Sequence, residues 1–123
     1  MTLLIRQGDL PGSPEAQVFV GADHDGLPVS LFLVDDAPGA GPRLHRHPYP
    51  ELFIVHAGEA RFEIDGAGIA ATAGDVLTAP AGTAHRFTNT GTEHLRLTAI
   101  HTAPQMETEW LEAAATSPET TSC

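Results

Sequence analysis

The stretch that decides the fold of this chain reads Gly39-Ala-Gly-Pro-Arg-Leu-His45-Arg-His47-Pro-Tyr-Pro-Glu51-Leu-Phe-Ile-Val-His-Ala-Gly58. His45 and His47 are two residues apart, so both imidazoles project from the same face of an extended strand. Prolines then interrupt the strand, and Glu51 begins a second alternating segment that carries Phe53 and Val55 on the same face. Because the chain must turn at the prolines, two imidazoles and one carboxylate come within reach of one point.

A second stretch follows after a gap of 15 residues and reads Gly74-x5-Pro80-x-Gly82-x2-His85-x3-Asn89. His85 leads another alternating segment and supplies a third imidazole. We interpret Asn89 as a turn residue that hydrogen-bonds nearby backbone, not as a further ligand. The glycines of the two stretches suit positions of positive φ or close backbone approach, and they are Gly39, Gly58, Gly74 and Gly82.

Three imidazoles and one carboxylate are a ligand set for a divalent metal. We therefore predict one ion per chain, held by His45, His47, Glu51 and His85. A single buried histidine is more often a hydrogen-bonded core residue, but four such groups facing one apolar interior without a cation would cost roughly several kcal/mol. This mixed set accommodates Fe, Mn, Ni, Cu or Zn, and the sequence does not choose among them.

The ten fixed positions of the two stretches resemble both signature motifs of the cupin superfamily, including a short gap between the motifs. The chain is most similar to small, single-domain, metal-binding cupins of the quercetinase type. The resemblance implies a double-stranded β-helix, also called a jelly-roll barrel, around the metal.

Period-two alternation between turn signals also predicts an all-β fold with nine or ten strands. Tight turns are expected at Asp25-Gly26 and Asp65-Gly66, and segments 51–56 and 60–64 are expected to pair across Gly58. We divide the chain into an N-terminal arm (1–17), a cupin barrel (18–103) and a C-terminal segment (104–123). The C-terminal segment is predicted to contain a short helix at 107–115, followed by a disordered tail.

Composition restricts the partners. The formal net charge is −10 and all six basic residues are arginines, which disfavours nucleic acid as a partner and removes lysine Schiff-base chemistry. The first residues contain neither a signal-type apolar segment nor a membrane span, so we expect a cytoplasmic protein. The lone Cys123 cannot close an internal disulfide. We also expect a homodimer that covers open strand edges and exchanges the N-terminal arm.

The faces shared with the ligands are apolar and lack a cluster of cations. A substrate pocket is therefore predicted for a small molecule with a metal-chelating oxygen, whereas sugar phosphates are disfavoured. The expected pocket residues are Phe53, Val55, Phe62, Phe87, His101 and Tyr49. His101 either packs in the core or rim or acts as a base near the metal, and Tyr49 either gates the pocket or packs in its loop. Trp110 is expected to cover a barrel end or a dimer surface.

Two classes of function follow from this site. The first is a metal-dependent enzyme, above all a dioxygenase acting on a small enolic, phenolic or dicarbonyl compound, with a cyclase or isomerase as the nearest variant. Glu51 would then be both ligand and proton acceptor. The second is a non-catalytic module that binds or senses a small molecule. The lack of a DNA-binding segment weakens the second class.

Overall fold

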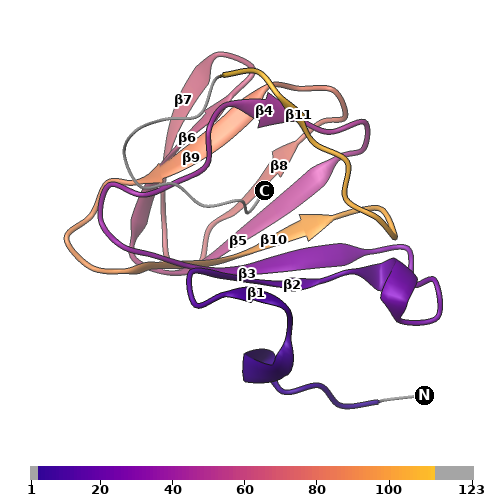
Figure 1. Ribbon diagram of the computed structural model, residues 1–123. Coiled ribbons are helices and arrows are strands. Elements are labelled where there is room, and N and C mark those ends of the chain that lie inside the picture. The colour runs from indigo at the N-terminus through magenta and orange to yellow at the C-terminus, as the bar shows by residue number, and fades with distance from the viewer. Residues whose placement is uncertain (1–2, 113–123) are drawn as a thin grey trace.

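The computed structural model describes residues 3–112, which form two antiparallel sheets facing each other (Figure 1). The six-stranded sheet has the order β1 (Gly12–Ser13), β2 (Ala16–Phe19), β3 (Ser30–Asp36), β10 (Leu95–His101), β5 (Glu51–Ala57) and β8 (Val76–Ala79). The five-stranded sheet has the order β11 (Glu109–Trp110), β4 (His45–Arg46), β9 (His85–Asn89), β6 (Glu59–Ile64) and β7 (Ala67–Thr72). The predicted all-β jelly-roll barrel is confirmed.

Helical structure within residues 3–112 is limited to two short 3-10 turns, η1 (Gln7–Asp9) and η2 (Gly21–Asp23). None of the helices described is long and apolar enough to cross a membrane. Part of the segment expected to be an arm takes part in the sheet, because β1 pairs with β2 through Gly12 and Ser13.

Four glycines mark places where the chain crosses from one sheet to the other. Gly39 lies between β3 and β4, Gly58 between β5 and β6, Gly74 between β7 and β8, and Gly82 between β8 and β9. All four have positive φ, with values of 86°, 88°, 93° and 74°. The conformational freedom predicted for these glycines is thus used at the corners of the barrel.

The expected pairing of segments 51–56 and 60–64 across Gly58 is wrong. Strand β5 pairs with β10 and β8, whereas β6 pairs with β7 and β9 in the opposite sheet. A turn signal in the sequence does not distinguish a hairpin from a corner at which the chain passes to the opposite sheet. Here β5 and β6 lie in opposite sheets and bury their apolar faces against each other across the core. The rings of Phe53 and Phe62 accordingly meet face to edge, 5.0 Å apart. By contrast, Asp65 and Gly66, with φ of 51° and 80°, do close the predicted hairpin between β6 and β7.

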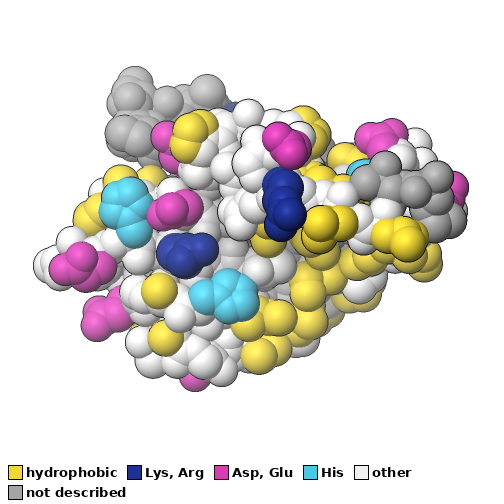
Figure 2. All heavy atoms as spheres, turned by 90° about the horizontal axis from the view of Figure 1, so that it is seen from below, with side chains coloured by type: hydrophobic (Ala, Val, Ile, Leu, Met, Phe, Trp, Pro, Cys, Tyr) yellow, Lys and Arg dark blue, Asp and Glu magenta, His cyan; other side chains and the backbone are white. Residues whose placement is uncertain are grey.

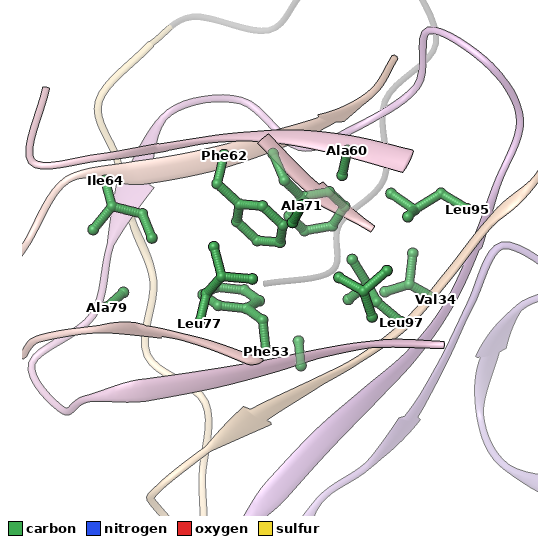
Figure 3. Close-up of a cluster of buried hydrophobic side chains, with 13 residues drawn as sticks. Val34, Phe53, Ala60, Phe62, Ile64, Ala71, Leu77, Ala79, Leu95 and Leu97 are labelled. Carbon is green, nitrogen blue, oxygen red and sulfur yellow. The ribbon is translucent and has the colours of Figure 1, made fainter. Parts of the chain in front are cut away.

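The hydrophobic core fills the space between the two sheets (Figure 3). Phe53, Phe62 and Phe87 are completely buried and pack against one another, with ring centroids 5.0–6.2 Å apart. Leu97 and Leu77, from β10 and β8, complete the contacts around these rings. This packing separates the barrel into a closed middle and two ends, and the predicted metal ligands lie at one end.

The helix expected at 107–115 is also a wrong prediction within the described residues. Residues 107–112 are not helical, and Glu109–Trp110 forms β11, which pairs with β4. One or two isolated helical turns have only marginal stability in water. The edge of the short strand β4, by contrast, offers backbone N–H and C=O groups with which a neighbouring strand can form hydrogen bonds. Residues 113–115 and the predicted tail lie outside the described residues.

Candidate metal centre

The four predicted ligands come from both sheets and meet at one end of the barrel. In the five-stranded sheet, His45 of β4 lies directly opposite His85 of β9. His47 follows β4, and its backbone carbonyl accepts a hydrogen bond from Gly82 N–H at 2.7 Å. Glu51 begins β5 in the other sheet. All four ligand side chains are buried, with residue exposures of 0–2%.

The ligand atoms converge on one point. The atoms that His45, His47, Glu51 and His85 offer all lie within 4.8 Å of one another. Glu51 Oε1 is at the centre of the contacts, 3.0 Å from His47 Nε2 and 3.0 Å from His85 Nε2. The spacing of these four residues along the sequence therefore predicts which side chains come together.

Hydrogen bonds on the far side of each imidazole set its tautomer. The Nδ1 atom of each ring lies against a backbone carbonyl, and the pairs are His45 with Arg43 O (2.5 Å), His47 with Glu107 O (2.7 Å) and His85 with Thr83 O (2.9 Å). A carbonyl oxygen only accepts, so each Nδ1 carries the hydrogen. In the neutral rings the Nε2 lone pairs then face Glu51.

This arrangement fits a divalent cation. Imidazole Nε2 atoms and a carboxylate oxygen are all acceptors, and acceptors 3.0 Å apart need a proton or a cation between them. Neutral imidazoles oriented by carbonyls, together with one carboxylate, are the donors that transition metals bind in proteins. The donor set thus meets the chemical requirements of the predicted ion.

The pKa of the Glu51 carboxyl group is held below its usual value. Burial alone would raise this pKa, but contacts with His101, and with His47 and His85 in their donor forms, outweigh burial. The first of these three neighbours, His101, lies directly opposite Glu51 in the β5–β10 pair, with its Nε2 3.3 Å from Glu51 Oε2. The structure places His101, fully buried, beside the four predicted ligands.

The segment for which a helix was expected closes this end of the barrel as an extended strand. Residues 107–112, here called the C-terminal strap, run along β4 and pair with it through β11. Arg46 forms a 2.6 Å ion pair with Glu109, and Leu111 N–H donates to Leu44 O at 2.9 Å. Trp110 packs on the ring of His45, 5.0 Å between centroids, so it covers the barrel end as expected from the sequence.

A hollow of about 420 Å³ opens beside His47, between the C-terminal strap and the loop after β4. It is lined by Arg46, His47, Pro48, Gly82, Glu107, Thr108 and Glu109. His47 connects this hollow to the cluster of ligands. The strap thus contributes three of the side chains around the approach to the four predicted ligands.

The apolar residues expected to line a substrate pocket do not line this hollow. Phe53, Val55, Phe62 and Phe87 are 0–1% exposed and form the core instead. Alternation along a strand predicts which side chains point inward, but it does not show whether other side chains already fill the space. Tyr49 is a packed loop residue, because its ring stacks on His47 with centroids 5.2 Å apart.

Asn89 and the exposed histidines His56 and His94 have structural partners. Asn89 Oδ1 accepts a hydrogen bond from Gly91 N–H at 2.9 Å, which confirms its role in a turn. Two exposed histidines contact outer-face neighbours, His56 with Thr98 and His94 with Asp35. None of these groups takes part in the cluster at the barrel end.

Comparison with known proteins agrees with the geometry. Residues 32–101 match the model of the cupin domain, and the chain belongs to this family. Its sequence matches none of the curated proteins with which it was compared.

Solved structures resemble this barrel closely. A variant of oxalate decarboxylase from Bacillus subtilis gives a TM-score of 0.70 at 26% identity, over 78% of this chain and 27% of that chain. Another structure of that decarboxylase, from work on its Mn(II) centres, gives 0.72 at 26% identity, over 85% and 30% of the two chains. An uncharacterized protein with a double-stranded β-helix domain from Klebsiella pneumoniae gives 0.70 at 19% identity, over 91% and 93%, which shows the fold alone. This chain spans less than a third of the decarboxylase chains.

Proposed function

We propose that this cupin is a metal-dependent dioxygenase that acts on a small enolic, phenolic or dicarbonyl compound. The observation that carries the proposal is the convergence of three imidazoles and one carboxylate, whose ligand atoms lie within 4.8 Å of one another, next to a hollow that reaches His47. His45, His47, Glu51 and His85 would hold one Fe, Mn, Ni, Cu or Zn ion. A bound redox-capable ion would supply Lewis acidity and electron transfer to a substrate with a chelating oxygen.

The residues of the chain would bind and deprotonate the substrate. Glu51 is buried, and its lowered pKa favours the carboxylate form, which would accept the proton of an acidic substrate hydroxyl. The rings of Tyr49 and Trp110 pack on His47 and His45 and limit the access of water to the ligands. The hollow is large enough for a small molecule, since ligand sites commonly measure about 300–1,000 Å³.

The charge around the hollow supports a substrate without phosphate groups. Glu107 and Glu109 line it, and Arg46, the arginine of the lining, already forms an ion pair with Glu109. The net charge of −10 adds general repulsion of anions. A neutral or weakly acidic enol, phenol or dicarbonyl compound suits this surface better than a sugar phosphate.

A metal-dependent decarboxylase is the second candidate function. It is supported by the similarity to oxalate decarboxylase at 26% identity, including a structure from work on Mn(II) centres. The acidic strap argues against a dianion such as oxalate as the substrate.

Oxygen consumption and product analysis separate the two candidates. Protein loaded separately with Fe(II), Mn(II), Ni(II) or Cu(II) would be mixed with a β-diketone, a catechol, a flavonol and oxalate, with His47→Ala as the matched control. We expect oxygen uptake with at least one enolic or phenolic compound, and none with the control. Release of carbon dioxide from oxalate, without oxygen uptake from the other compounds, would contradict the dioxygenase and favour the decarboxylase.

We also propose that the protein is a homodimer, and the outer face of the six-stranded sheet supports this. Strand register aligns outward apolar side chains in adjacent rows, namely Phe19, Leu31, Ile100 and Leu52 in one and Leu33, Ile54 and Val76 in the other. A band of hydrophobic side chains is visible on the face shown in Figure 2. Leu3 and Leu4 of the N-terminal arm are 90% and 65% exposed, and a second copy could cover them.

A further inference from the structure

The fourth histidine at the barrel end has a different hydrogen-bond arrangement from the three metal ligands. His101 Nδ1 contacts the hydroxyl of Tyr49 at 2.6 Å instead of a backbone carbonyl. That hydroxyl oxygen already accepts a hydrogen bond from Glu107 N–H at 3.2 Å. When that hydroxyl donates its own hydrogen to His101 Nδ1, the hydrogen of the neutral imidazole lies on Nε2, and the Glu51 carboxylate oxygen 3.3 Å from Nε2 favours this tautomer.

The resulting tautomer makes His101 a donor toward the site. Its Nε2 lies 3.3 Å from Glu51 Oε2, close to this oxygen but not aligned for a hydrogen bond in this structure. His47 and His85 present Nε2 lone pairs to Glu51 Oε1 at 3.0 Å. The two oxygens of Glu51 thus have opposite surroundings. Oε1 lies among acceptors, which requires a cation or a proton, and Oε2 lies beside a donor.

We propose that His101, with its tautomer set by Tyr49, is a positioning residue for the metal ligand Glu51. It holds Oε2 and thereby directs Oε1 toward the ion. The inference rests on the metal-binding part of the proposed function, and it does not depend on which reaction the metal centre performs.

The surroundings keep this pair of residues in place. Tyr49 lies between Pro48 and Pro50, and its ring stacks on His47 with an angle of 5° between the planes. His101 is fully buried and pairs with Glu51 through the backbone ladder of β5 and β10. The C-terminal strap contributes the Glu107 N–H that orients the Tyr49 hydroxyl. The geometry of the ligand thus depends on contacts from three separate segments of the chain.

Removing such a partner of a ligand typically lowers metal affinity by about 10- to 100-fold. His101→Leu keeps a buried side chain of moderate size but removes the donor to Glu51. His101→Gln retains an amide N–H that can reach Oε2, so it should restore most of the affinity. Tyr49→Phe keeps the stacked ring and removes only the hydroxyl, which leaves the tautomer of His101 unset and should give an intermediate loss.

The experiment measures Co(II) binding by competition with a chelator, together with the visible absorption of the bound Co(II). The four variants are His101→Leu, His101→Gln, Tyr49→Phe and, as the matched control, His56→Leu. His56 lies on the outer face and contacts Thr98, so its replacement should change neither measurement. Thermal unfolding of each metal-free variant shows whether it is folded.

We expect His101→Leu to lose about 10- to 100-fold in Co(II) affinity and to change the absorption bands, and His101→Gln to recover both. Wild-type affinity and spectrum in folded His101→Leu or Tyr49→Phe would overturn the proposal. Equal losses in the Leu and Gln variants would also overturn it, because only a structural role would then remain. Failure of the proposed dioxygenase would appear as absent turnover with normal Co(II) binding, which is a different result.

Discussion

Asp36 is a buried carboxyl group whose replacement should change the free energy of unfolding in a way that depends on pH. It ends β3 at the opposite end of the strand from Ser30, which pairs with His101. The residue is 0% exposed, and neither of its side-chain oxygens has a hydrogen-bond partner within residues 3–112. Burial, and then the negative charges of Glu15 and Asp35, raise the pKa of Asp36 to about 7, although His94 opposes the shift. We predict that Asp36→Asn stabilises the protein above neutral pH.

The magnitude follows from linkage between protonation and folding. The pKa of about 7 in the folded protein exceeds the usual value of 3.8, so the folded state binds the proton more tightly than the unfolded chain. The contribution of Asp36 to the free energy of unfolding is therefore full below about pH 4 and is lost as the pH rises to about 7. At about 1.4 kcal/mol per pKa unit, the total loss is about 4 kcal/mol. Local relaxation around the charge lowers this figure, so we expect a gain of about 2–4 kcal/mol for the asparagine variant at pH 8.5.

Urea unfolding of the metal-free proteins at pH 4.5 and pH 8.5 tests this prediction. At pH 4.5 both side chains are largely neutral in the folded state, and the difference in unfolding free energy should shrink to about 1 kcal/mol or less. Asp23→Asn, at an exposed carboxylate, is the matched control and should change the free energy by less than about 0.5 kcal/mol at either pH. A variant at Asp36 that is equally or less stable than wild type at pH 8.5 would refute the reasoning.

Three further predictions concern the core, the chemistry and the assembly. Phe62→Ala should lower the free energy of unfolding by about 3–5 kcal/mol in urea titrations, because this 0%-exposed ring fills the space between the sheets; a loss below 1 kcal/mol would contradict that packing. Glu51→Gln should retain appreciable metal but lose about 100-fold or more in turnover of an enolic substrate, whereas unchanged turnover at matched metal content would leave Glu51 a ligand only. Ile100→Glu, on the outer face of the sheet, should shift light scattering from dimer toward monomer, and a stable wild-type monomer at micromolar concentration would count against the dimer.

The sequence predicts well which four side chains converge at the barrel end, because their placement depends on local spacing. The two-residue separation of His45 and His47 places both on one strand face, and the prolines before Glu51 force the return of the chain. The contact between Glu51 and His101 could not be predicted in this way. It depends on the register between β5 and β10, strands that are far apart in the chain.

The errors also have physical causes. Trp110 and its neighbours have helical character in isolation, but the open edge of β4 decides their conformation, and that edge exists only in the folded barrel. Phe62 and Phe87 were correctly expected to point inward, yet alternation could not show that they fill the interior themselves. Gly58 was correctly expected at a sharp turn, but a turn signal carries no information about which sheet the next strand joins.

Metal content is the most direct test of the metal centre. Elemental analysis would be made on wild-type protein purified without added metal. It would be repeated after the protein is loaded with Mn(II) or Co(II) and the excess ion is removed. His47→Ala and the control His56→Ala would be treated identically. We predict about one divalent ion per chain in loaded wild type and in the control, and a severe loss in His47→Ala, which removes one of the four buried ligands. Loaded wild type without bound metal, or His47→Ala with full occupancy and unchanged affinity, would contradict the assignment of this barrel end as a metal centre.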